Sequence, residues 1–362
     1  MTILAQYLAW MVPFLISTAA GAAVLAPLTP VPGSQPGSTA VLGISDNGYI
    51  AGDYKDADLS LHGFVGKANG PYTTFDAGAG GTESRAVNNQ GRITGYSGAN
   101  TCNPHQDCVE FERAPGGAIS PVTKSGVQLF GTVQGILSSG VFVGDYHPAG
   151  SPLDQTSGFY GANGQYTSDL TLPFATRETE PRSINIGGEV DGWYIVPGDI
   201  SRGFALSGGV VSIINYPDPT ETGTDLEGLN DGGWIAGQWS DALGNSHAFV
   251  LSPDLVTFTD IIVPGATQVQ AWGINNAGEV AVSTDIGSFI YCINGPVGFC
   301  HGMHGHGAPA SSHRAAAGSV RAVPCLNDCR FHGATPSIFF SPASGREPVP
   351  VMPSARSKRL PQ

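Results

Sequence analysis

Residues 228–239 read GLNDGGWIAGQW, and related versions of this stretch occur six times along the 362-residue chain. We call the aliphatic residue at the second position of each version the anchor. Successive anchors are 43, 49, 48, 45 and 45 residues apart. A period of about 40–50 residues indicates a repeat architecture and suits one four-stranded blade of a β-propeller. The six anchors are Ile44, Val87, Ile136, Ile184, Leu229 and Ile274.

A glycine lies four residues after the anchor in every copy, usually two residues after Asn, Asp or Ser. A short hairpin built on a type I turn needs a positive φ at its end, which glycine adopts without steric cost. We therefore expect six tight turns in which the glycine has a structural role. These glycines are Gly48, Gly91, Gly140, Gly188, Gly233 and Gly278.

The segment after each turn has the period of two that is typical of a strand. Positions six, eight and ten after the anchor share one strand face, and they are apolar, glycine and aromatic in most copies. A repeated mid-strand glycine predicts close backbone approach, as where blades crowd toward a central axis. The aromatic residues are expected to fill the space between neighbouring blades. The glycines are Gly52, Gly95, Gly144, Gly192 and Gly237, and the aromatics are Tyr54, Tyr146, Tyr194 and Trp239.

A third strand contains HGF at 62–64 or HAF at 247–249, and a fourth follows it, as at 72–75. The last copy lacks its fourth strand. Residues 23–33 resemble the fourth-strand region of the fifth copy, and both regions end in Val-Pro-Gly. The prediction is an all-β, six-bladed β-propeller of four-stranded antiparallel blades over residues 23–292, with the ring closed by an N-terminal strand. The copies start near residues 38, 81, 130, 178, 223 and 268.

The pattern G-[IL]-N-x-x-G-x-[IV]-x-G-x-[YW], followed by H-[AG]-F, resembles the bacterial extracellular HAF-repeat family. The resemblance covers roughly residues 38–292, and its motifs are strongest in the first and fifth copies. It implies an exported, propeller-like protein, and the family offers no established catalytic residues. The second and sixth copies depart most, since they lack the histidine and the full set of aromatic positions.

The N-terminal segment has no charged side chain before Asp46 and contains small residues around Ala22. This pattern predicts a signal peptide over residues 1–22 and a secreted, periplasmic or cell-surface protein. An uncleaved membrane anchor is the alternative, although Pro13 and the absence of flanking Lys or Arg count against it. In an exported chain, cysteines in short-range pairs indicate disulfides. The pairs are Cys102/Cys108, Cys292/Cys300 and Cys325/Cys329.

The net charge of −13 argues against a nucleic-acid partner and against an anionic membrane surface, because both require a basic footprint. Residues 1–300 contain 9 Lys/Arg against 27 Asp/Glu, whereas residues 301–362 contain 7 against 2. Repeat character is lost at the same point. We therefore expect residues 293–362 to be a low-complexity, disordered tail. The mature domain is expected to be a monomer that does not insert into a membrane.

In an antiparallel meander, the loops between second and third strands emerge at the same end as the blade-to-blade connections. These two sets of segments contain 18 of the 27 acidic residues of the first 300. Function usually lies in loops on a rigid scaffold, so an acidic, variable loop face is the predicted contact surface. Its candidate binding residues are Asp107, Asp154, Asp199 and Asp241. The loops are expected at 55–61, 97–110, 147–157, 195–202, 240–246 and 284–287, and the connections at 76–84, 120–133, 169–182, 216–227 and 260–270.

Motifs that would indicate catalysis are absent: the sequence has no H-E-x-x-H, G-x-S-x-G or G-x-x-x-x-G-K-[ST]. No catalytic residue and no organic cofactor are therefore expected. Asp53, Asp56 and Asp58 alternate as in a calcium loop, but the rest of an EF-hand loop is missing. A solvated hairpin is the main interpretation, and a weak calcium site is the alternative. His62 and His247 recur at one repeat position and are expected to bind nearby carbonyl groups.

These observations favour an exported binding module that contacts a protein or glycan through the acidic loop face. The first alternative is a secreted glycoside- or ester-cleaving hydrolase with carboxylates at the channel mouth, and the second is a structural cell-surface protein. Two carboxyl groups about 5–10 Å apart beside a deep pocket would favour the enzyme. A channel lined by small or apolar residues would favour the binding module.

Overall fold

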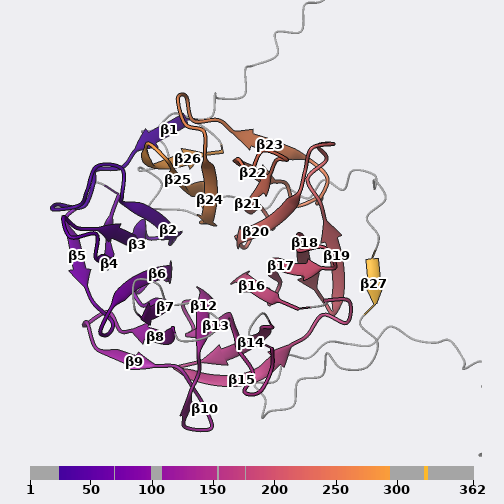
Figure 1. The fold of residues 1–362 in the computed structure, drawn as a ribbon, viewed down its shortest axis with the longest axis horizontal. Coiled ribbons are helices and arrows are strands. Elements are labelled where there is room, and N and C mark those ends of the chain that lie inside the picture. The colour runs from indigo at the N-terminus through magenta and orange to yellow at the C-terminus, as the bar shows by residue number, and fades with distance from the viewer. Residues whose placement is uncertain are drawn as a thin grey trace, which may run out of the picture. The chain divides into compact units, whose positions relative to one another are not determined.

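A computed structural model of the chain describes residues 24–293, except 69, 99–107, 153–154 and 176, together with residues 322–324. Across these residues the secondary structure consists of strands, with no helix. The strands form six sheets arranged as blades around a central axis (Figure 1). The predicted six-bladed β-propeller is therefore confirmed.

In each blade the chain runs as an antiparallel meander from an inner strand at the axis to an outer strand at the rim. Blade 1 contains β2 (Ala40–Ile44), β3 (Tyr49–Lys55), β4 (Leu61–Lys67) and β5 (Tyr72–Phe75). Blade 2 contains β6 (Gly81–Val87), β7 (Ile93–Gly98), β8 (Val109–Arg113) and β9 (Ile119–Pro121). Blade 3 contains β12 (Gly131–Ile136), β13 (Val141–Tyr146), β14 (Ser157–Ala162) and β15 (Gln165–Leu170).

The remaining blades follow the same order. Blade 4 contains β16 (Thr179–Ile184), β17 (Val190–Val196), β18 (Ile200–Ser207) and β19 (Val210–Ile214). Blade 5 contains β20 (Gly223–Leu229), β21 (Ile235–Ser240), β22 (Ser246–Leu251) and β23 (Phe258–Ile261). Blade 6 contains β24 (Val269–Ile274), β25 (Glu279–Thr284), β26 (Gly287–Cys292) and, from the N-terminal end, β1 (Val24–Pro27).

The N-terminal strand completes the sixth blade, as the sequence predicts. β1 pairs antiparallel with β26, with Val24 opposite Cys292 and Pro27 opposite Phe289. Two segments more than 250 residues apart therefore share one sheet, and the ring is closed by backbone hydrogen bonds rather than by side-chain packing alone.

Two blades have additional strands at the outer edge that the sequence pattern did not predict. The connection between blades 2 and 3 forms a small hairpin of β10 (Thr123–Lys124) and β11 (Val127–Gln128), and β10 pairs with β15. In the tail, β27 (Ala322–Pro324) pairs with β19 of blade 4. An outer strand presents unpaired backbone groups that accept such additions. Residues 1–22 and the rest of the tail after Ile293 lie outside the described residues, so their predicted states stay predictions.

The repeated tight turns are confirmed in all six blades. The turn glycines have φ between 69° and 84°, and each donates its N–H to the carbonyl oxygen three residues earlier, at 2.9–3.1 Å. Any residue with a side chain would be strained at this φ, which explains why glycine recurs there.

The mid-strand glycines are crowded, but not by the neighbouring blade. A Cβ at Gly52 would lie 1.9 Å from the carbonyl oxygen of Ala40, and one at Gly237 would lie 2.6 Å from that of Asp225. Both oxygens belong to the inner strand of the same blade. The predicted close approach is confirmed, and its predicted cause, crowding toward the axis, is wrong. Blades instead meet at the residue before the anchor, where a Cβ at Gly228 would lie 2.5 Å from the carbonyl oxygen of Trp272.

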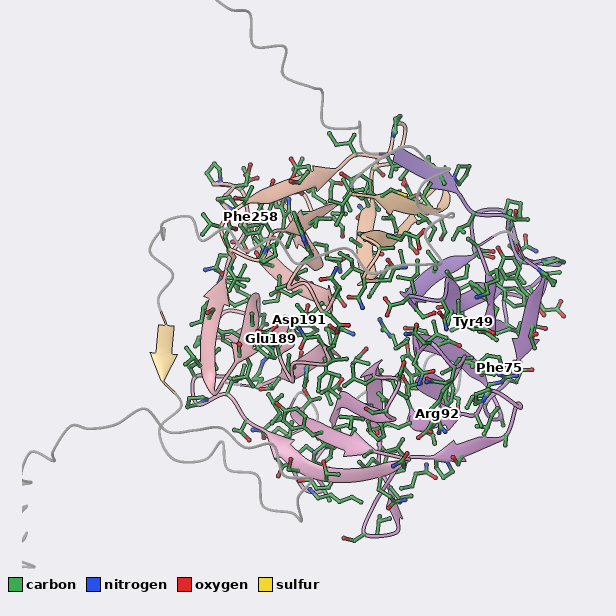
Figure 2. The ribbon with its side chains drawn as sticks, turned by 180° about the vertical axis from the view of Figure 1, so that it is seen from behind. Tyr49, Phe75, Arg92, Glu189, Asp191 and Phe258 are labelled. Atoms are coloured by element: carbon green, nitrogen blue, oxygen red, sulfur yellow. The ribbon has the colours of Figure 1, made fainter. Side chains whose placement is uncertain are left out.

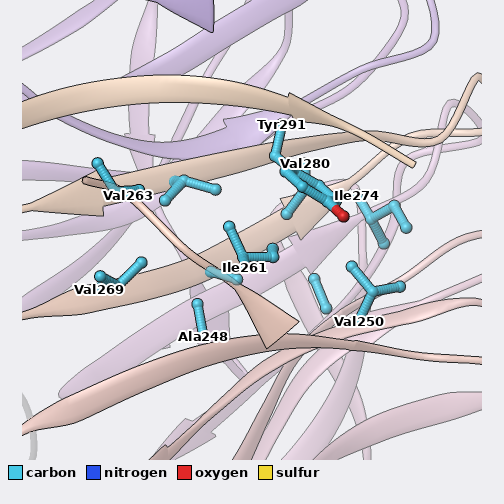
Figure 3. Packing of buried hydrophobic residues seen from close by; sticks show 11 residues of the cluster. Ala248, Val250, Ile261, Val263, Val269, Ile274, Val280 and Tyr291 are labelled. Carbon is cyan, nitrogen blue, oxygen red and sulfur yellow. The ribbon is translucent and has the colours of Figure 1, made fainter. Parts of the chain in front are cut away.

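Side chains fill the spaces between neighbouring blades. The four predicted aromatic residues are only 3–8% exposed, and Trp239 of blade 5 packs with Ile214 of blade 4. Between blades 5 and 6, aliphatic side chains form one continuous cluster that includes Val250, Val269 and Ile274 (Figure 3). The core of the protein is therefore divided among the blade interfaces, and the axis is left to other residues.

Candidate functional site

A β-bulge in each blade places one side chain at the axis. The pairing of the first and second strands shifts register just before the anchor, so the residue two positions before the anchor has no partner. Such bulges change the direction of a side chain. These six residues differ in type from blade to blade, and we call them the bulge ring. They are Leu42, Arg85, Gln134, Arg182, Glu227 and Trp272.

The bulge ring surrounds an axial cavity of about 110 Å³, which five of its members line directly. Arg182 forms ion pairs with Glu180 at 3.1 Å and with Glu227 at 3.2 Å. Arg85 forms an ion pair with Glu83 at 2.5 Å, and its guanidinium lies 5.1 Å from the ring centroid of Trp272. This part of the axis is therefore occupied by charged side chains that are paired with one another.

Several carboxyl groups are buried in the blades, and Asp191 lies near the axis in blade 4 (Figure 2). Burial raises the pKa of Asp191 to about 8, against the opposing contact with the Ser183 hydroxyl. Burial also raises the pKa of Glu227 to about 7, although the Arg182 guanidinium favours its ionised form. The pKa values of three more carboxyl groups are raised by burial. They belong to Asp53, Glu110 and Asp225.

The size of the axial cavity limits what it can hold. Its volume corresponds to roughly three or four water molecules, whereas ligand pockets usually occupy about 300–1,000 Å³. Glu180 and Glu227 are both held by one guanidinium, so they are not the free acid–base pair that a hydrolase requires. The bulge ring was not predicted from the sequence. Its trace there is the variety of residue types two positions before the anchor, which does not reveal that these side chains share one axis.

A second cavity of about 230 Å³ lies on the axis at the end where the tight turns emerge, and we call it the turn-side bowl. Its floor is the set of six aliphatic anchors, which also line the axial cavity. Its rim carries one residue from each blade, two positions after the anchor. The rim residues are Asp46, Asn89, Ser138, Ile186, Asp231 and Asn276.

Hydrogen bonds between blades stabilise the bowl. The side-chain amides of Asn88, Asn185, Asn230 and Asn275 each donate to a carbonyl oxygen of the next blade, at 3.1–3.3 Å. At the rim, Asp231 accepts the backbone N–H of Ile186 at 3.0 Å. The turns thus form a ring of blade-to-blade contacts around an open hollow.

On the opposite, loop side, the loops of three consecutive blades contact one another. Ser246 of blade 5 donates to the side chain of Gln268, at 2.9 Å, and the adjacent Thr267 donates to Asp285 of blade 6, at 2.7 Å. The segment that leads from β1 into blade 1 continues the series. Gln35 donates its N–H to the carbonyl oxygen of Lys55, at 2.8 Å, and Gly37 lies beside Asp285 of blade 6, since a Cβ there would be 3.8 Å from the Asp285 carbonyl oxygen. Blades 5, 6 and 1 therefore present one connected loop surface.

Large aliphatic side chains are exposed on this surface, and with their neighbouring carboxylates they form what we call the three-blade patch. Leu243 is 87% exposed, Leu59 63% and Ile286 50%, and Ile262 of the blade 5–6 connection is 77% exposed. Each lies one to three residues after an aspartate. The carboxylates of the patch belong to Asp56, Asp58, Asp241, Asp260 and Asp285.

Aspartate-centred turns fix two of these aliphatic tips. The Asp241 carboxylate accepts the backbone N–H groups of Leu243 and Asn245, at 2.8 and 2.9 Å. Asp56 accepts those of Asp58 and Ser60, both at 2.9 Å. Bonds from the side chain and backbone of Asn245 lower the pKa of Asp241, and the backbone bond from Ser60 lowers that of Asp56. Both carboxylates therefore stay ionised while they hold their loops.

The predicted site residues fall into different environments. Asp53 is buried in β3 and Asp58 is exposed on a loop, and no group of three metal-ligating side chains occurs in the part of the chain that the structure describes. Asp199 is an exposed residue that pairs with Arg177 at 2.9 Å. Asp241 lies in the three-blade patch. Asp107 and Asp154 lie outside the described residues.

The recurrent histidines bind carboxylates rather than the expected carbonyl groups. His62 contacts Asp76 at 2.7 Å and Asp56 at 3.2 Å, and His247 contacts Asp241 at 3.1 Å. Burial alone lowers the pKa of His62, but its two carboxylate partners outweigh burial and leave the pKa raised. In blades 1 and 5 the histidine thus ties the turn aspartate to the third strand, six residues away.

The predicted acidic face needs one correction, because several of its residues lie in strands. Glu83, Glu180, Asp225 and Glu227 belong to inner strands and Glu110 belongs to β8. The predicted connections and one loop extended too far into the blades. The acidic residues therefore divide into an exposed loop set and a set buried in the strands, most of it on the inner strands.

The cysteine pairs stay predictions. Cys108 and Cys292 are buried at 0% and 1% exposure, and their predicted partners Cys102 and Cys300 lie outside the described residues, as do Cys325 and Cys329. Among the residues with described structure, we find no helix long and apolar enough to cross a membrane.

No protein-family model and no curated protein matches the chain. Among solved structures, a streptogramin B lyase is 12% identical, with a TM-score of 0.42 over 75% of this chain and 98% of the lyase. The WD40 propeller domain of Doa1 is also 12% identical, with a TM-score of 0.41 and coverages of 75% and 98%. The Aleuria aurantia lectin, in complex with alpha-methyl-L-fucoside, is 9% identical, with a TM-score of 0.41 and coverages of 74% and 98%.

Proposed function

We propose that this chain is a protein-interaction module that binds its partner through the three-blade patch. The observation that carries the proposal is the exposure of four large aliphatic side chains on one connected loop surface. Single exposed aliphatic residues are common, but a group of them rimmed by polar residues is typical of an interaction site. The turns around Asp56 and Asp241 hold two of them in place, so little conformational entropy is lost on binding.

The chemistry of the patch defines the partner that fits it. Leu59, Leu243 and Ile286 offer apolar surface, and the aspartates beside them are ionised groups at the rim. A complementary protein surface would present aliphatic or aromatic side chains flanked by Lys or Arg. Charge complementarity of this kind raises the rate of association and selects among partners.

The two axial cavities support a binding module over a hydrolase. Neither reaches the volume of an ordinary substrate pocket, and the six aliphatic anchors form a ring between them. The apolar lining expected of a binding module is thus present at the anchor ring, and the charged side chains of the axial cavity are paired with one another.

Export of the protein, its disulfides and its place among HAF-repeat proteins belong to the same proposal. They rest on the apolar N-terminal segment, the paired cysteines and the repeated tripeptide. N-terminal sequencing of the mature protein would test cleavage near Ala22. Peptide mass mapping without reduction would test the three short-range pairs.

A phage-displayed random peptide library, selected on the full chain, tests the interaction surface. Selected peptides should combine apolar residues with Lys or Arg, and the triple variant Leu59→Ser, Leu243→Ser, Ile286→Ser should bind them at least tenfold more weakly. Ile186→Ser is the matched control, because it removes an equally exposed aliphatic side chain from the opposite end of the ring. Equal binding of the selected peptides to the triple variant would show that the patch is not the contact surface.

A further inference from the structure

We infer that the turn-side bowl is a second binding site, distinct from the three-blade patch, and that it takes a primary alkylammonium group. This chemistry is shared by the side chain of lysine and by small aliphatic amines. The inference rests on three features of the bowl: its volume, its aliphatic floor and the charge on its rim.

The volume suits a short alkyl chain. The bowl occupies about 230 Å³, which corresponds to roughly seven or eight water molecules and lies below the usual range for drug-sized ligands. It therefore has room for a few carbon atoms and one polar head group, but not for an oligosaccharide.

The floor is apolar in every blade. All six anchors that form it are Ile, Val or Leu, and Ile186 adds an aliphatic side chain to the rim at 77% exposure. Alkyl groups gain about 25 cal/mol for each Å² of apolar surface that leaves water. A hollow whose floor is entirely aliphatic favours the hydrocarbon part of a ligand over a hydrated metal ion.

The rim residues include two carboxylates and no cation, and the ammonium of Lys67 donates to the carbonyl oxygen of Asn47, the residue after Asp46, rather than to a rim carboxylate. Among the described residues neither Asp46 nor Asp231 forms an ion pair. The two carboxylates are bridged by an uncharged side-chain amide. The side-chain amide of Asn276 donates to Asp46 at 3.0 Å and to Asp231 at 2.6 Å. An ionised carboxyl group accepts about four hydrogen bonds, so Asp231, which accepts two from these partners, has unused capacity.

The charged side chains deeper in the channel do not oppose this, because its guanidiniums are paired. Arg85 pairs with Glu83, and Arg182 pairs with Glu180 and Glu227. A concave site walled by protein concentrates the field of the two rim carboxylates at its mouth. An ammonium at the rim would therefore meet a favourable potential, while its alkyl chain covers the anchors.

Titration of the full chain with n-butylammonium tests the site, with 1-butanol as the uncharged probe of equal length. We expect saturable binding of n-butylammonium, weaker binding at high salt, and no competition by 1-butanol. The double variant Asp46→Asn, Asp231→Asn keeps side chains of the same shape and removes the charge. It should bind about tenfold more weakly, a loss of about 1.4 kcal/mol, because the ammonium group no longer meets a carboxylate.

A second variant keeps the test informative if the double variant fails to fold. Ile186→Ser removes apolar surface from the rim but keeps the N–H that donates to Asp231, so it should weaken n-butylammonium binding and leave the melting temperature unchanged. The loop-side triple variant should bind n-butylammonium normally. The inference would be overturned if n-butylammonium showed no saturable binding, or if both rim variants bound it as tightly as the parent chain does.

The same titration distinguishes the two sources of the ammonium group. A blocked Gly-Gly-Lys-Gly-Gly peptide that binds at least tenfold more tightly than n-butylammonium would identify a lysine side chain of a protein partner. Equal affinity for the peptide and n-butylammonium would identify a free amine. A norleucine peptide, which lacks the charge, should not bind in either case.

Discussion

Blades 5 and 2 share a backbone framework but differ in the side chains that fill it. Blade 5 has Gly237 and Trp239 in β21 and Ala248 in β22, whereas blade 2 has Gly95 and Ser97 in β7 and Glu110 in β8. The glycine is kept in both, because a Cβ there would lie 2.6 Å (blade 5) or 2.0 Å (blade 2) from the inner strand's carbonyl oxygen. Backbone-to-backbone contacts therefore admit one residue type.

Where side chains rather than backbone fill the space around a position, residues of different size can occupy it in different blades. Where blade 5 uses Trp239, blade 2 has Ser97, and the preceding connection moves in until a Cβ at Gly78 would lie 3.0 Å from the Ser97 hydroxyl. Where blade 5 uses Ala248, blade 2 has Glu110, and its carboxyl fits because Gly131 of the next blade has no side chain. The difference teaches that the repeat specifies the backbone, and that each blade completes its packing locally.

The largest effect is expected from adding one methyl group to a mid-strand glycine. Gly95→Ala should lower the free energy of unfolding by more than about 4 kcal/mol or prevent folding, because the new Cβ would overlap the carbonyl oxygen of Glu83. Gly237→Ala should do the same in blade 5. Urea unfolding followed by circular dichroism measures both, with Gly116→Ala as control, since nothing lies within 4 Å of that position. A normal midpoint for either variant would remove the basis of the comparison.

The next largest effect is a fall in stability as pH rises. Burial raises the pKa of Asp191 to about 8 and that of Glu227 to about 7, so the folded state binds more protons than the unfolded state between about pH 4 and 8. Stability is therefore full below about pH 4 and is lost as pH rises through these values. We expect a loss of roughly 2–4 kcal/mol between pH 5 and pH 8, measured by urea unfolding.

Asp191→Asn tests the origin of this pH dependence, because it keeps the shape and removes the titrating group. The variant should be more stable than the parent at pH 8 and should flatten the profile. Asp58→Asn, at an exposed loop position, should leave the profile unchanged. If Asp191→Asn keeps the full slope, the buried axial carboxyl groups are not its source.

A smaller, stabilising effect is expected when blade 2 is made to resemble blade 5. Glu110→Ala removes a carboxyl group that is 0% exposed and whose pKa is raised by burial and by the charge of Asp145. It should stabilise the fold by about 1–2 kcal/mol at pH 8 and by less at pH 5, because a carboxyl group with a raised pKa costs less stability as pH falls. A melting temperature that falls at both pH values would show that the carboxyl contributes favourable contacts in its pocket.

The smallest effect concerns the hydrogen bonds between turns. Asn230 donates to Asn275 of the next blade, whereas blade 1 has Ser45 at this position and no such amide. Asn230→Ser copies blade 1 and should cost about 1 kcal/mol, and Asn230→Ala should cost about 2 kcal/mol because the turn also loses its cap. An unchanged stability of Asn230→Ser would show that the bond between blades contributes nothing, whereas equal losses in the two variants would show this of the cap.

Features that depend on period and backbone geometry were predictable from the sequence. The blade number, the turn glycines, the buried aromatics and the closing strand all follow from residue types at fixed offsets. The length of the inner strands did not follow, because Glu180 and Asp225 read as polar loop residues although they lie beside the axis. A polar residue in a strand and one in a loop look alike when their partners are far away in sequence.

The bulge ring and the three-blade patch could not be predicted for a related reason. A bulge adds one residue on one strand only, and the pattern of Arg85, Arg182 and Glu227 shows its meaning only when the six blades face one axis. The patch joins Leu243, Ile286 and Leu59, which are up to 227 residues apart in sequence. Both sites exist because the ring brings corresponding segments of several copies close together.

Closure by β1 has a consequence for where the ring begins. Val24 lies opposite Cys292 in the same sheet, so the first and last strands of the propeller are neighbours. A short linker could join them, and the chain could be reopened in the connection between blades 3 and 4 without removing any strand pairing among β1 to β26. The order of blades around the ring would be unchanged in such a circular permutant. The position of the chain termini is thus set by the gene, whereas the closed ring of blades does not require the chain to start at any particular blade.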